Sequence, residues 1–360
     1  MKKATLLVAA VAATGLLLAG CAGQGSGPTP SGGASDGALD MTPITVNVGL
    51  LTPGLSNSGY DIALAKGYFE EQGITINSTT FKAGEDQAAS LARGDLDVAT
   101  GGVSAANYNA IAQGVGGIVV ADKGYDSEEF NWTQFVTTKE KYDAGLQDIC
   151  DVKGLKVTTV AKAGSQPFAL QRTLETCGLT MDDIQQTIVS FPDMAAALAG
   201  GSVDVIFPTE PTLTTITQDG SNVIIGSPVQ GYPVQQQSVI YYSQKFLEHP
   251  DYGKRWMIAY LKGVRDYNNA LVNPAHVDYD AIVKILQDSK AVPNPALLPD
   301  MNMVGLNPDG KVVMDSLSWD LAEFQKEGIV QDQDLTIDDV VDNTFVDYAV
   351  SVLGKYTPAS

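Results

Sequence analysis

The chain has 360 residues, with 42 acidic and 22 basic side chains and a net charge of −20 at pH 7. So acidic a surface repels nucleic acid and anionic lipid, which argues against both as partners. The body from residue 44 onward is long enough for two domains, each with its own core.

The N-terminus has the pattern of a secretory signal peptide over residues 1–20. Lys2 and Lys3 precede an apolar run from Ala4 to Ala19, which is too short to span a membrane. The run ends in LAGC, which resembles the cleavage box of bacterial lipoproteins, with Cys21 as the lipidated residue. The alternative is an ordinary signal peptide that happens to contain a cysteine.

Residues 21–43 are expected to form a flexible tether behind the lipidated Cys21. Eleven of residues 22–40 are Gly, Ser or Pro, a composition that cannot build a core. We therefore expect the protein at the outer face of the cytoplasmic membrane, attached through this lipid anchor only.

One eight-residue phrase occurs twice, as LARGDLDV at 91–98 and as LAGGSVDV at 198–205. Each copy follows apolar residues at helical spacing, and a glycine (94, and 200 or 201) provides the left-handed residue that ends the helix. Short buried strands are predicted at 96–99 and 203–206. They lead into loops of small and polar residues at 100–104 and 208–211.

The match extends upstream of both copies. Strands are predicted at 44–51 and 74–80, with a helix between them that begins near Gly59. The second set has strands at 155–160 and 187–191, with a helix that has Pro167 at its first position. The chain thus contains two β-α-β-α-β units. Parallel sheets bind ligands beyond the carboxyl ends of their strands, so two facing units predict an α/β two-lobe clamp with four loops around one cleft.

Cys150 and Cys177 are the two cysteines that remain after Cys21. Cys150 precedes the strand at 155–160, and Cys177 ends the helix that runs back antiparallel to that strand. Export permits a disulfide, and this topology favours one. Two buried free thiols are the alternative.

Five segments resemble the solute-binding proteins of bacterial ABC importers, in the family typified by sulfonate, nitrate and thiamine-pyrimidine binding proteins. They are GYDIALAKGYFEEQGI (59–74), LARGDLDVATGG (91–102), DVKGLKVTTV (151–160), the segment 198–211 that ends in TEP, and YYSQKFLEHPD (241–251). The similarity covers nearly all of residues 44–350 and follows the order of the family.

The resemblance implies a type II periplasmic-binding-protein-like clamp. Lobe 1 would comprise residues 44–135 and 239–355, lobe 2 would comprise residues 136–238, and the chain would cross near 133–138 and 236–242. It further implies a monomer without a cofactor that delivers a small solute to an ABC permease with its ATPase.

An enzyme that acts on a small heterocycle and a clamp-fold sensor are the alternative functions. His249 and His276 both lie outside the four loops, and no His or Cys cluster has metal-ligand spacing. The cysteines lie at the wrong ends of their strands to be nucleophiles. The sequence therefore favours a binding protein over an enzyme.

The candidate solute contacts come from the strand ends. Ser58 and Ser165 could instead only cap helices, and Tyr60, Tyr125 and Tyr232 could serve packing as well as stacking. The full set is Ser56, Asn57, Ser58, Tyr60, Gly102, Ser104, Ser165, Gln166, Thr209, Glu210 and Tyr232.

Glu210 is the most informative member of this set. Its carboxylate either interacts with the dipole of the helix that Pro211 begins, or faces the cleft and favours an amine or ring N–H. The loops contain no Arg, and Lys82, Lys123 and Lys162 lie only nearby. Since a simple anion usually needs a fixed cation or several donors, the sequence favours a zwitterion such as taurine, or an aminopyrimidine.

Overall fold

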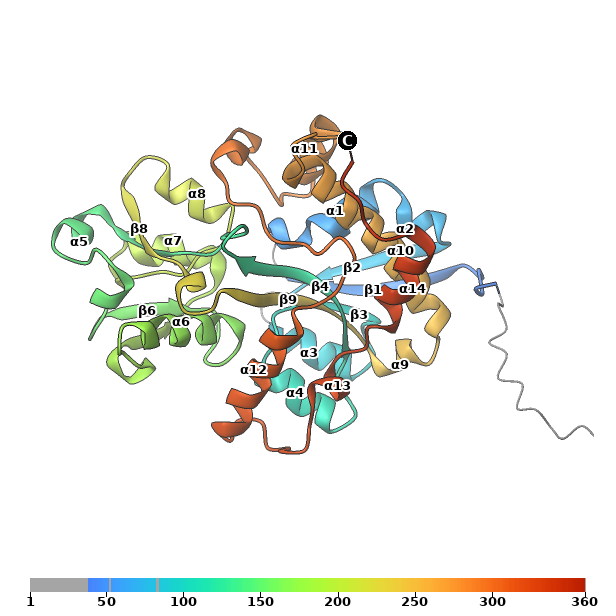
Figure 1. The fold of residues 1–360 in the computed structure, drawn as a ribbon, viewed down its shortest axis with the longest axis horizontal. Coiled ribbons are helices and arrows are strands. Elements are labelled where there is room, and N and C mark those ends of the chain that lie inside the picture. Colours follow the sequence, from blue (N-terminus) through green and yellow to red (C-terminus); the bar gives the residue numbers. More distant parts are fainter. Residues whose placement is uncertain (1–37, 52, 82–83, 360) are drawn as a thin grey trace, which may run out of the picture. The chain divides into compact units, whose positions relative to one another are not determined.

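The computed structural model describes residues 38–359 except 52, 82 and 83 (Figure 1). The predicted signal peptide and Cys21 lie outside the described residues, as does nearly all of the predicted tether. Among the described residues, no helix is long and apolar enough to cross a membrane.

A five-stranded sheet forms the first half of the fold, in the order β2-β1-β3-β9-β4. β1 pairs in parallel with β2 and β3, whereas β9 is antiparallel to β3 and β4. The strands are β1 (Ile44–Leu50), β2 (Ile74–Thr80), β3 (Val98–Gly101), β4 (Ile118–Ser127) and β9 (Val234–Tyr242). The last of these returns from far along the chain to lie between β3 and β4.

The second half repeats this order with shorter strands. β5 (Phe135–Thr138) pairs with β8 (Asn222–Gly226), and β6 (Lys156–Thr159) pairs in parallel with β7 (Gln185–Ile188). Single bridges join Val157 to Val205 in parallel and Val136 to Ile206 in antiparallel fashion. Residues 205–206 therefore lie between β6 and β5, as β3 lies between β1 and β9.

The repeated phrase marks this third strand in both halves. Asp97 accepts a hydrogen bond from the backbone N–H of Asn47 in β1, and Asp204 accepts one from the backbone N–H of Lys156 in β6, each at 2.8 Å. Gly94 and Gly201 both adopt positive φ before these aspartates. The strand predicted at 203–206 is reduced to the two bridges at Val205 and Ile206.

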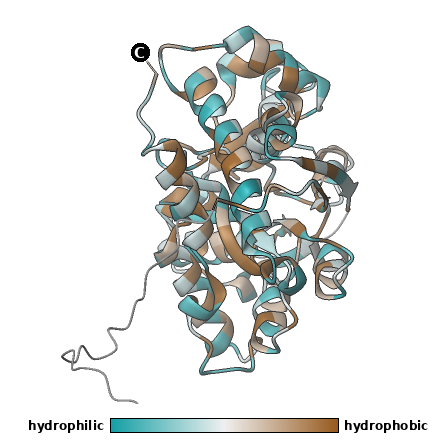
Figure 2. Ribbon diagram, turned by 90° about the vertical axis from the view of Figure 1, so that its right-hand side faces the viewer, coloured by the Kyte–Doolittle hydropathy of each residue, from teal (hydrophilic) through white to brown (hydrophobic). Residues whose placement is uncertain are grey.

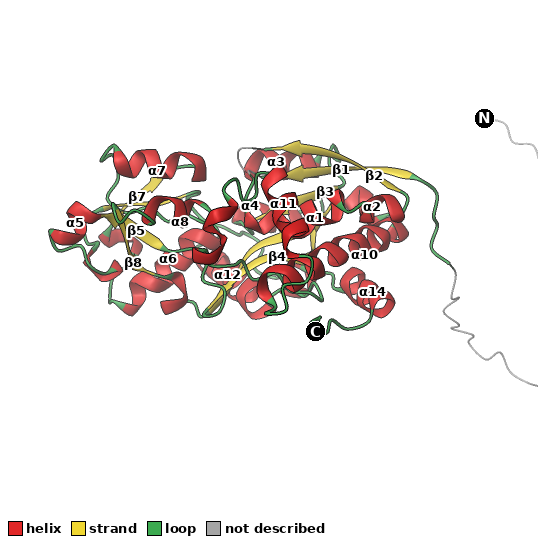
Figure 3. Ribbon diagram, turned by 90° about the horizontal axis from the view of Figure 1, so that it is seen from above, coloured by secondary structure: helices red, strands yellow, loops and turns green. Residues whose placement is uncertain are grey.

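Helices cover both faces of each half (Figures 1 and 3). On the large sheet, one face carries α1 (Ser58–Ala65), α2 (Tyr68–Glu71), α10 (Pro250–Tyr267), α11 (Tyr279–Asp288) and α14 (Thr344–Leu353). The other face carries α3 (Gly84–Ala92), α4 (Ala105–Ala112), α12 (Met314–Lys326) and α13 (Ile337–Val340). Many helices carry both hydrophobic and hydrophilic residues (Figure 2).

The smaller half has α6 (Ser165–Thr176) on one face and α7 (Phe191–Ala199) with α8 (Thr212–Thr217) on the other. The short helices α5 (Lys139–Asp143) and α9 (Gln244–Leu247) follow β5 and β9. α6 begins at Ser165, so Pro167 is its third residue and not its first as predicted. Pro167 still lies in the first turn, where a backbone N–H has no intrahelical partner.

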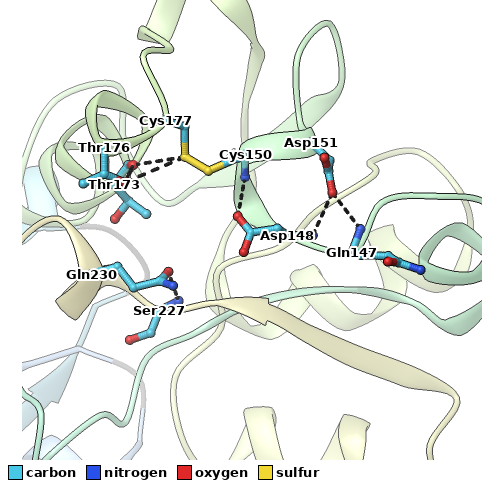
Figure 4. Close-up of a disulfide and its surroundings, with 9 residues drawn as sticks. All are labelled: Gln147, Asp148, Cys150, Asp151, Thr173, Thr176, Cys177, Ser227 and Gln230. Carbon is cyan, nitrogen blue, oxygen red and sulfur yellow. Dashed lines mark hydrogen bonds between the residues drawn. A yellow bond between two sulfur atoms is a disulfide. The ribbon is translucent and has the colours of Figure 1, made fainter.

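A disulfide joins Cys150 to Cys177, with 5.4 Å between their Cα atoms (Figure 4). Cys150 lies in a 3-10 turn, Ile149–Asp151, ahead of β6, and Cys177 follows the last residue of α6. The bridge therefore ties the entry of β6 to the end of the helix that follows it, as the topology of the sequence suggested.

Candidate functional site

Two of the predicted loops meet directly at the carboxyl ends of their strands. The backbone N–H of Ser165, the first residue of α6, donates to the carbonyl oxygen of Val103 at 3.3 Å. The Ser165 hydroxyl donates to the carbonyl oxygen of Gln237 at 3.3 Å. A Cβ added to Gly102 would lie 3.1 Å from the Ser165 Oγ, so glycine permits this approach. The structure thus brings Gly102 and Ser165 together beside β9.

Thr209 and Glu210 join the same region through residues 132 and 133. Thr133 forms an antiparallel bridge with Thr209, and the N–H of Glu210 donates to the carbonyl oxygen of Trp132. The Thr133 hydroxyl in turn donates to Oδ2 of Asp126 at 2.8 Å. A loop of the second repeat unit therefore ends against a carboxylate of β4.

Asp126, Gln235 and Gln237 form the floor of this region; we call them the floor cluster. Asp126 is opposite Gln235 in the β4–β9 register. Gln235 Nε2 donates to the carbonyl oxygen of Ser165, and Gln237 Nε2 donates to Gln235 Oε1, both at 2.7 Å. Sequence reasoning missed all three residues because it looked for contacts in loops. The polar run Gln235–Gln237 inside a buried strand was the available signal.

Burial raises the pKa of Asp126 to about 7, although the hydrogen bond from Thr133 and the nearby polar side chain of Gln237 favour the ionised form. No charged side chain of the described residues contributes to this shift. The floor cluster is therefore polar and can carry a negative charge that no cation in the described part of the chain neutralises.

Glu210 is 1% exposed and faces α8 and the segment at Asn302. Its Oε2 accepts from the backbone N–H of Thr214 at 3.0 Å, and its Oε1 accepts from the Thr214 hydroxyl at 2.8 Å and from the Asn302 N–H at 3.2 Å. Burial raises its pKa, and these bonds oppose the rise. This arrangement agrees with the helix-terminus interpretation, although Glu210 also lines a pocket of about 320 Å³ with Asp300.

A buried cation on β4 contacts the loop that follows β1. Lys123 is 2% exposed, and its Nζ donates to the Ser56 hydroxyl at 3.0 Å. Burial lowers the pKa of Lys123 to about 8, against the opposing charges of Asp61 and Asp122. From the sequence alone, Lys123 was expected only near the loops.

The remaining predicted contacts are engaged in packing or local bonds. Asn57 is 4% exposed, and the Ser58 hydroxyl donates to the Leu55 carbonyl oxygen. The Ser104 hydroxyl caps α4 at Asn107. Gln166 accepts from the Val160 N–H and donates to the Phe207 carbonyl oxygen, so it ties two loops of one half together.

The three tyrosines contact protein groups in this structure. Tyr60 is 1% exposed, and its hydroxyl lies 2.6 Å from the Ser78 Oγ. The Tyr232 hydroxyl donates to the backbone and side-chain oxygens of Ser316, and Tyr125 packs edge-on against Phe130. These contacts agree with the packing alternative for each ring.

Comparison with known proteins identifies relatives of the whole chain. The family model described as "NMT1/THI5 like" matches residues 56–275. The chain is 28% identical over 362 aligned positions to a Bacillus subtilis protein called "Putative aliphatic sulfonates-binding protein", with 97% of each chain covered.

Solved structures share the fold. The alkanesulfonate-binding protein SsuA from Xanthomonas axonopodis pv. citri, bound to MOPS, has a TM-score of 0.66 at 18% identity, over 84% of this chain and 99% of that one. The periplasmic nitrate-binding protein NrtA from Synechocystis PCC 6803 has a TM-score of 0.70 at 14% identity, over 88% and 90%. With its family model matched over more than half its length and with this two-lobe α/β architecture, the chain belongs to the NMT1/THI5-like family.

Proposed function

We propose that the protein is the extracytoplasmic solute-binding component of an ABC importer, which captures a small organic solute and delivers it to a permease. The observation that carries this proposal is the convergence of Gly102, Ser165 and Thr209 on the floor cluster, because these three residues come from both repeat units. The Bacillus subtilis relative, called "Putative aliphatic sulfonates-binding protein", supports a role in binding.

We propose an organic sulfonate as the solute class, with an amine-bearing sulfonate such as taurine ahead of an aminopyrimidine. The relative named for aliphatic sulfonates supports the sulfonate group. Lys123, buried at Ser56, supplies a cation close to the first loop. The unneutralised carboxyl of Asp126 supports a positively charged or N–H-bearing group elsewhere on the solute.

A thermal-shift screen tests this proposal. The panel comprises taurine, ethanesulfonate, nitrate, 4-aminopyrimidine and an aromatic acid. A solute at 100 times its dissociation constant stabilises the protein by about 2.7 kcal/mol, which is readily measured. Stabilisation by a sulfonate supports the proposal, and stabilisation by nitrate or the aromatic acid alone would overturn the solute class.

We also propose that residues 1–20 are removed and that Cys21 carries the lipid anchor. The LAGC sequence and the Gly-, Ser- and Pro-rich segment behind it support this. A Cys21→Ser variant should then leave the membrane fraction on cell fractionation. Its retention there with unchanged electrophoretic mobility would contradict the anchor.

The lobe boundaries are proposed at 44–135 with 239–355 for lobe 1, and at 136–238 for lobe 2. The repeated strand order supports this division, because β5 to β8 form the smaller half between the crossings. The chain then passes between lobes only along β4–β5 and β9.

A further inference from the structure

We propose that Asp126 is a solute contact that selects solutes carrying a protonated amine or an N–H donor, with its Oδ1 as the acceptor. This inference rests on the proposed function and narrows it to a chemical feature of the solute.

The carboxyl of Asp126 is half satisfied. The side chain is fully buried, at 0% exposure, and Oδ2 accepts from the Thr133 hydroxyl. Within the part of the chain that the structure describes, Oδ1 is buried and has no hydrogen-bond partner. A buried carboxylate oxygen without a donor is costly, and native proteins rarely leave one unpaired. A donor from outside the chain would remove that cost.

The position of Asp126 separates it from an ordinary core carboxyl. It lies opposite Gln235, whose amide holds the Ser165 carbonyl oxygen at the start of α6. Its partner Thr133 is bridged to Thr209. Asp126 is thus linked by one intermediate residue to a predicted contact on each of two loops, at the place where the two repeat units meet.

Among the residues that the structure describes, no charged group faces Asp126 from the elements packed against it. β9 presents Gln235 and Gln237, and the segment after β4 presents Thr133 and the backbone of Trp132. On its own strand, Lys123 bonds to Ser56, and Asp122 and Tyr125 have other partners. Glu210, next to Thr209, faces Thr214 and Asn302. The positive charge that would complement Asp126 is therefore expected from the solute.

Asp122 provides a matched control on the same strand. It is 2% exposed, and burial raises its pKa to about 7, as for Asp126. Its oxygens, however, are both satisfied: Oδ1 accepts from Gln236 and the Gly124 N–H, and Oδ2 accepts from the Asn307 N–H. Asp122 is therefore as buried as Asp126 and has a similarly raised pKa, but both of its carboxylate oxygens already accept hydrogen bonds.

Because the pKa of Asp126 is raised, the affinity for an amine-bearing solute should depend on pH. Near pH 6 the carboxyl is mostly protonated in the solute-free protein, and near pH 8 it is mostly ionised. An ammonium group binds the ionised form, so binding of an amine releases a proton. For a group that titrates at about 7, the affinity for an aminosulfonate should rise about tenfold between pH 6 and pH 8.

The test compares taurine with ethanesulfonate, which has the same carbon chain and sulfonate but no amine. Calorimetric titrations use the full chain, the Asp126→Asn variant and the Asp122→Asn variant at pH 6 and pH 8. We expect the unaltered protein to prefer taurine. In Asp126→Asn, taurine affinity should fall about 10- to 100-fold, the range for a hydrogen bond between charged groups, while ethanesulfonate affinity changes less than about threefold. Asp122→Asn should keep the taurine-to-ethanesulfonate ratio.

Each outcome separates this inference from the proposed function. Equal binding of the two sulfonates at both pH values would overturn the role of Asp126 and leave the solute class standing. If neither sulfonate binds, the proposed sulfonate class is wrong. The role of Asp126 is then tested by comparing the affinities for 4-aminopyrimidine and for pyrimidine, which lacks the amine. If Asp126→Asn does not fold, the taurine preference and its rise with pH in the unaltered protein still decide the matter.

Discussion

Single side chains position the strands on which the proposed site depends. Asp97 and Asp204 each accept the N–H of the neighbouring first strand, and each aspartate N–H donates back to the carbonyl oxygen of that same residue at 2.9 Å. The Asp-Val of the repeated phrase thus fixes the register of the third strand against the first. The loop that follows each third strand is thereby placed at the carboxyl edge of its sheet.

Replacing Glu210 with Gln should mainly reduce stability. The two carboxylate oxygens accept three donors from Thr214 and Asn302, whereas a glutamine amide offers one acceptor oxygen and places an N–H₂ group against donors. We expect the free energy of unfolding to fall by about 1–3 kcal/mol, with affinity nearly unchanged. Urea unfolding and calorimetric titration of the same variant measure both quantities.

Thr214→Val is the control for Glu210→Gln, because it removes only one donor. The free energy of unfolding of Thr214→Val should fall by a smaller amount, about 0.5–1.5 kcal/mol. A large loss of affinity in Glu210→Gln without a loss of stability would instead place the carboxylate in the cleft.

Buried carboxyls should make the protein more stable at mildly acidic pH. Burial raises the pKa of Asp122 and of Asp126 from 3.8 to about 7, and that of Asp61 to about 6. Between the unfolded-state pKa of 3.8 and these raised values, the folded state binds more protons than the unfolded state. The free energy of unfolding is therefore highest below about pH 4 and falls as the pH rises to 7. Carboxyls with a lowered pKa, such as that of Asp183, titrate below this window.

The measurement is urea unfolding of the solute-free protein at pH 4.5 and pH 7. We expect a decrease of several kcal/mol, since each unit of pKa difference corresponds to about 1.36 kcal/mol. Asp122→Asn should flatten the dependence because it removes one of the titrating groups. Stability that instead increases from pH 4.5 to 7 would contradict the raised pKa values.

At the scale of elements, α12 connects the two halves of the fold through aromatic contacts. Trp319 packs against Phe168 of α6 and against Tyr232, with ring centroids 5.5 and 5.3 Å apart. Phe324 lies 4.4 Å from the Phe168 ring. A late helix that packs on the large sheet thus also contacts the smaller half, in addition to the strands β4 and β9.

The disulfide should stabilise the α6 end of the smaller half. Cys150 and Cys177 are 27 positions apart, so closing this loop restricts the unfolded chain and is worth about 3.5 kcal/mol in the chain-entropy model. The variant Cys150→Ser/Cys177→Ser should lose about that much unfolding free energy, measured in urea. Two reactive thiols in denatured, unreduced protein with Cys21→Ser would show that the bridge is absent.

For the whole molecule, we expect the solute to favour a closed arrangement. A solute that touches loops from both lobes binds the closed state better than the open one, and so shifts the population toward it. The contacts between Ser165 and Val103 and between Asn302 and Glu210 are among those that opening would break. A permease could then recognise the closed form by the fixed geometry of both lobes.

Solution scattering and paired labels test closure. Asn57 and Gln166 are buried, so the exposed residues Ala106 of α4 and Lys162 of the loop before α6 are better sites for labels. In a Cys21→Ser background, the label distance and the radius of gyration should both decrease with saturating taurine. Labels at Ala106 and Lys311, both within the proposed lobe 1, form the control pair. Unchanged values for the first pair would indicate a rigid pocket.

The sequence by itself determined the two repeat units and most of their elements. β1 and β2 begin at the predicted residues and α1 begins one residue before Gly59, because periodic apolar residues and helix-ending glycines act over a few neighbouring positions. The family and the two-lobe fold were likewise predictable from the five family-like segments between residues 59 and 251, which follow one another in the order of the family.

Only the tertiary structure decided which polar groups face one another. Val98 pairs with Tyr242, and Asp126 lies opposite Gln235, across more than a hundred intervening residues in each case. Such pairings depend on how distant strands align, and no local pattern encodes them. For the same reason the loop residues Ser58 and Gln166 turned out to be engaged within the protein, while the open acceptor belongs to a strand residue, Asp126.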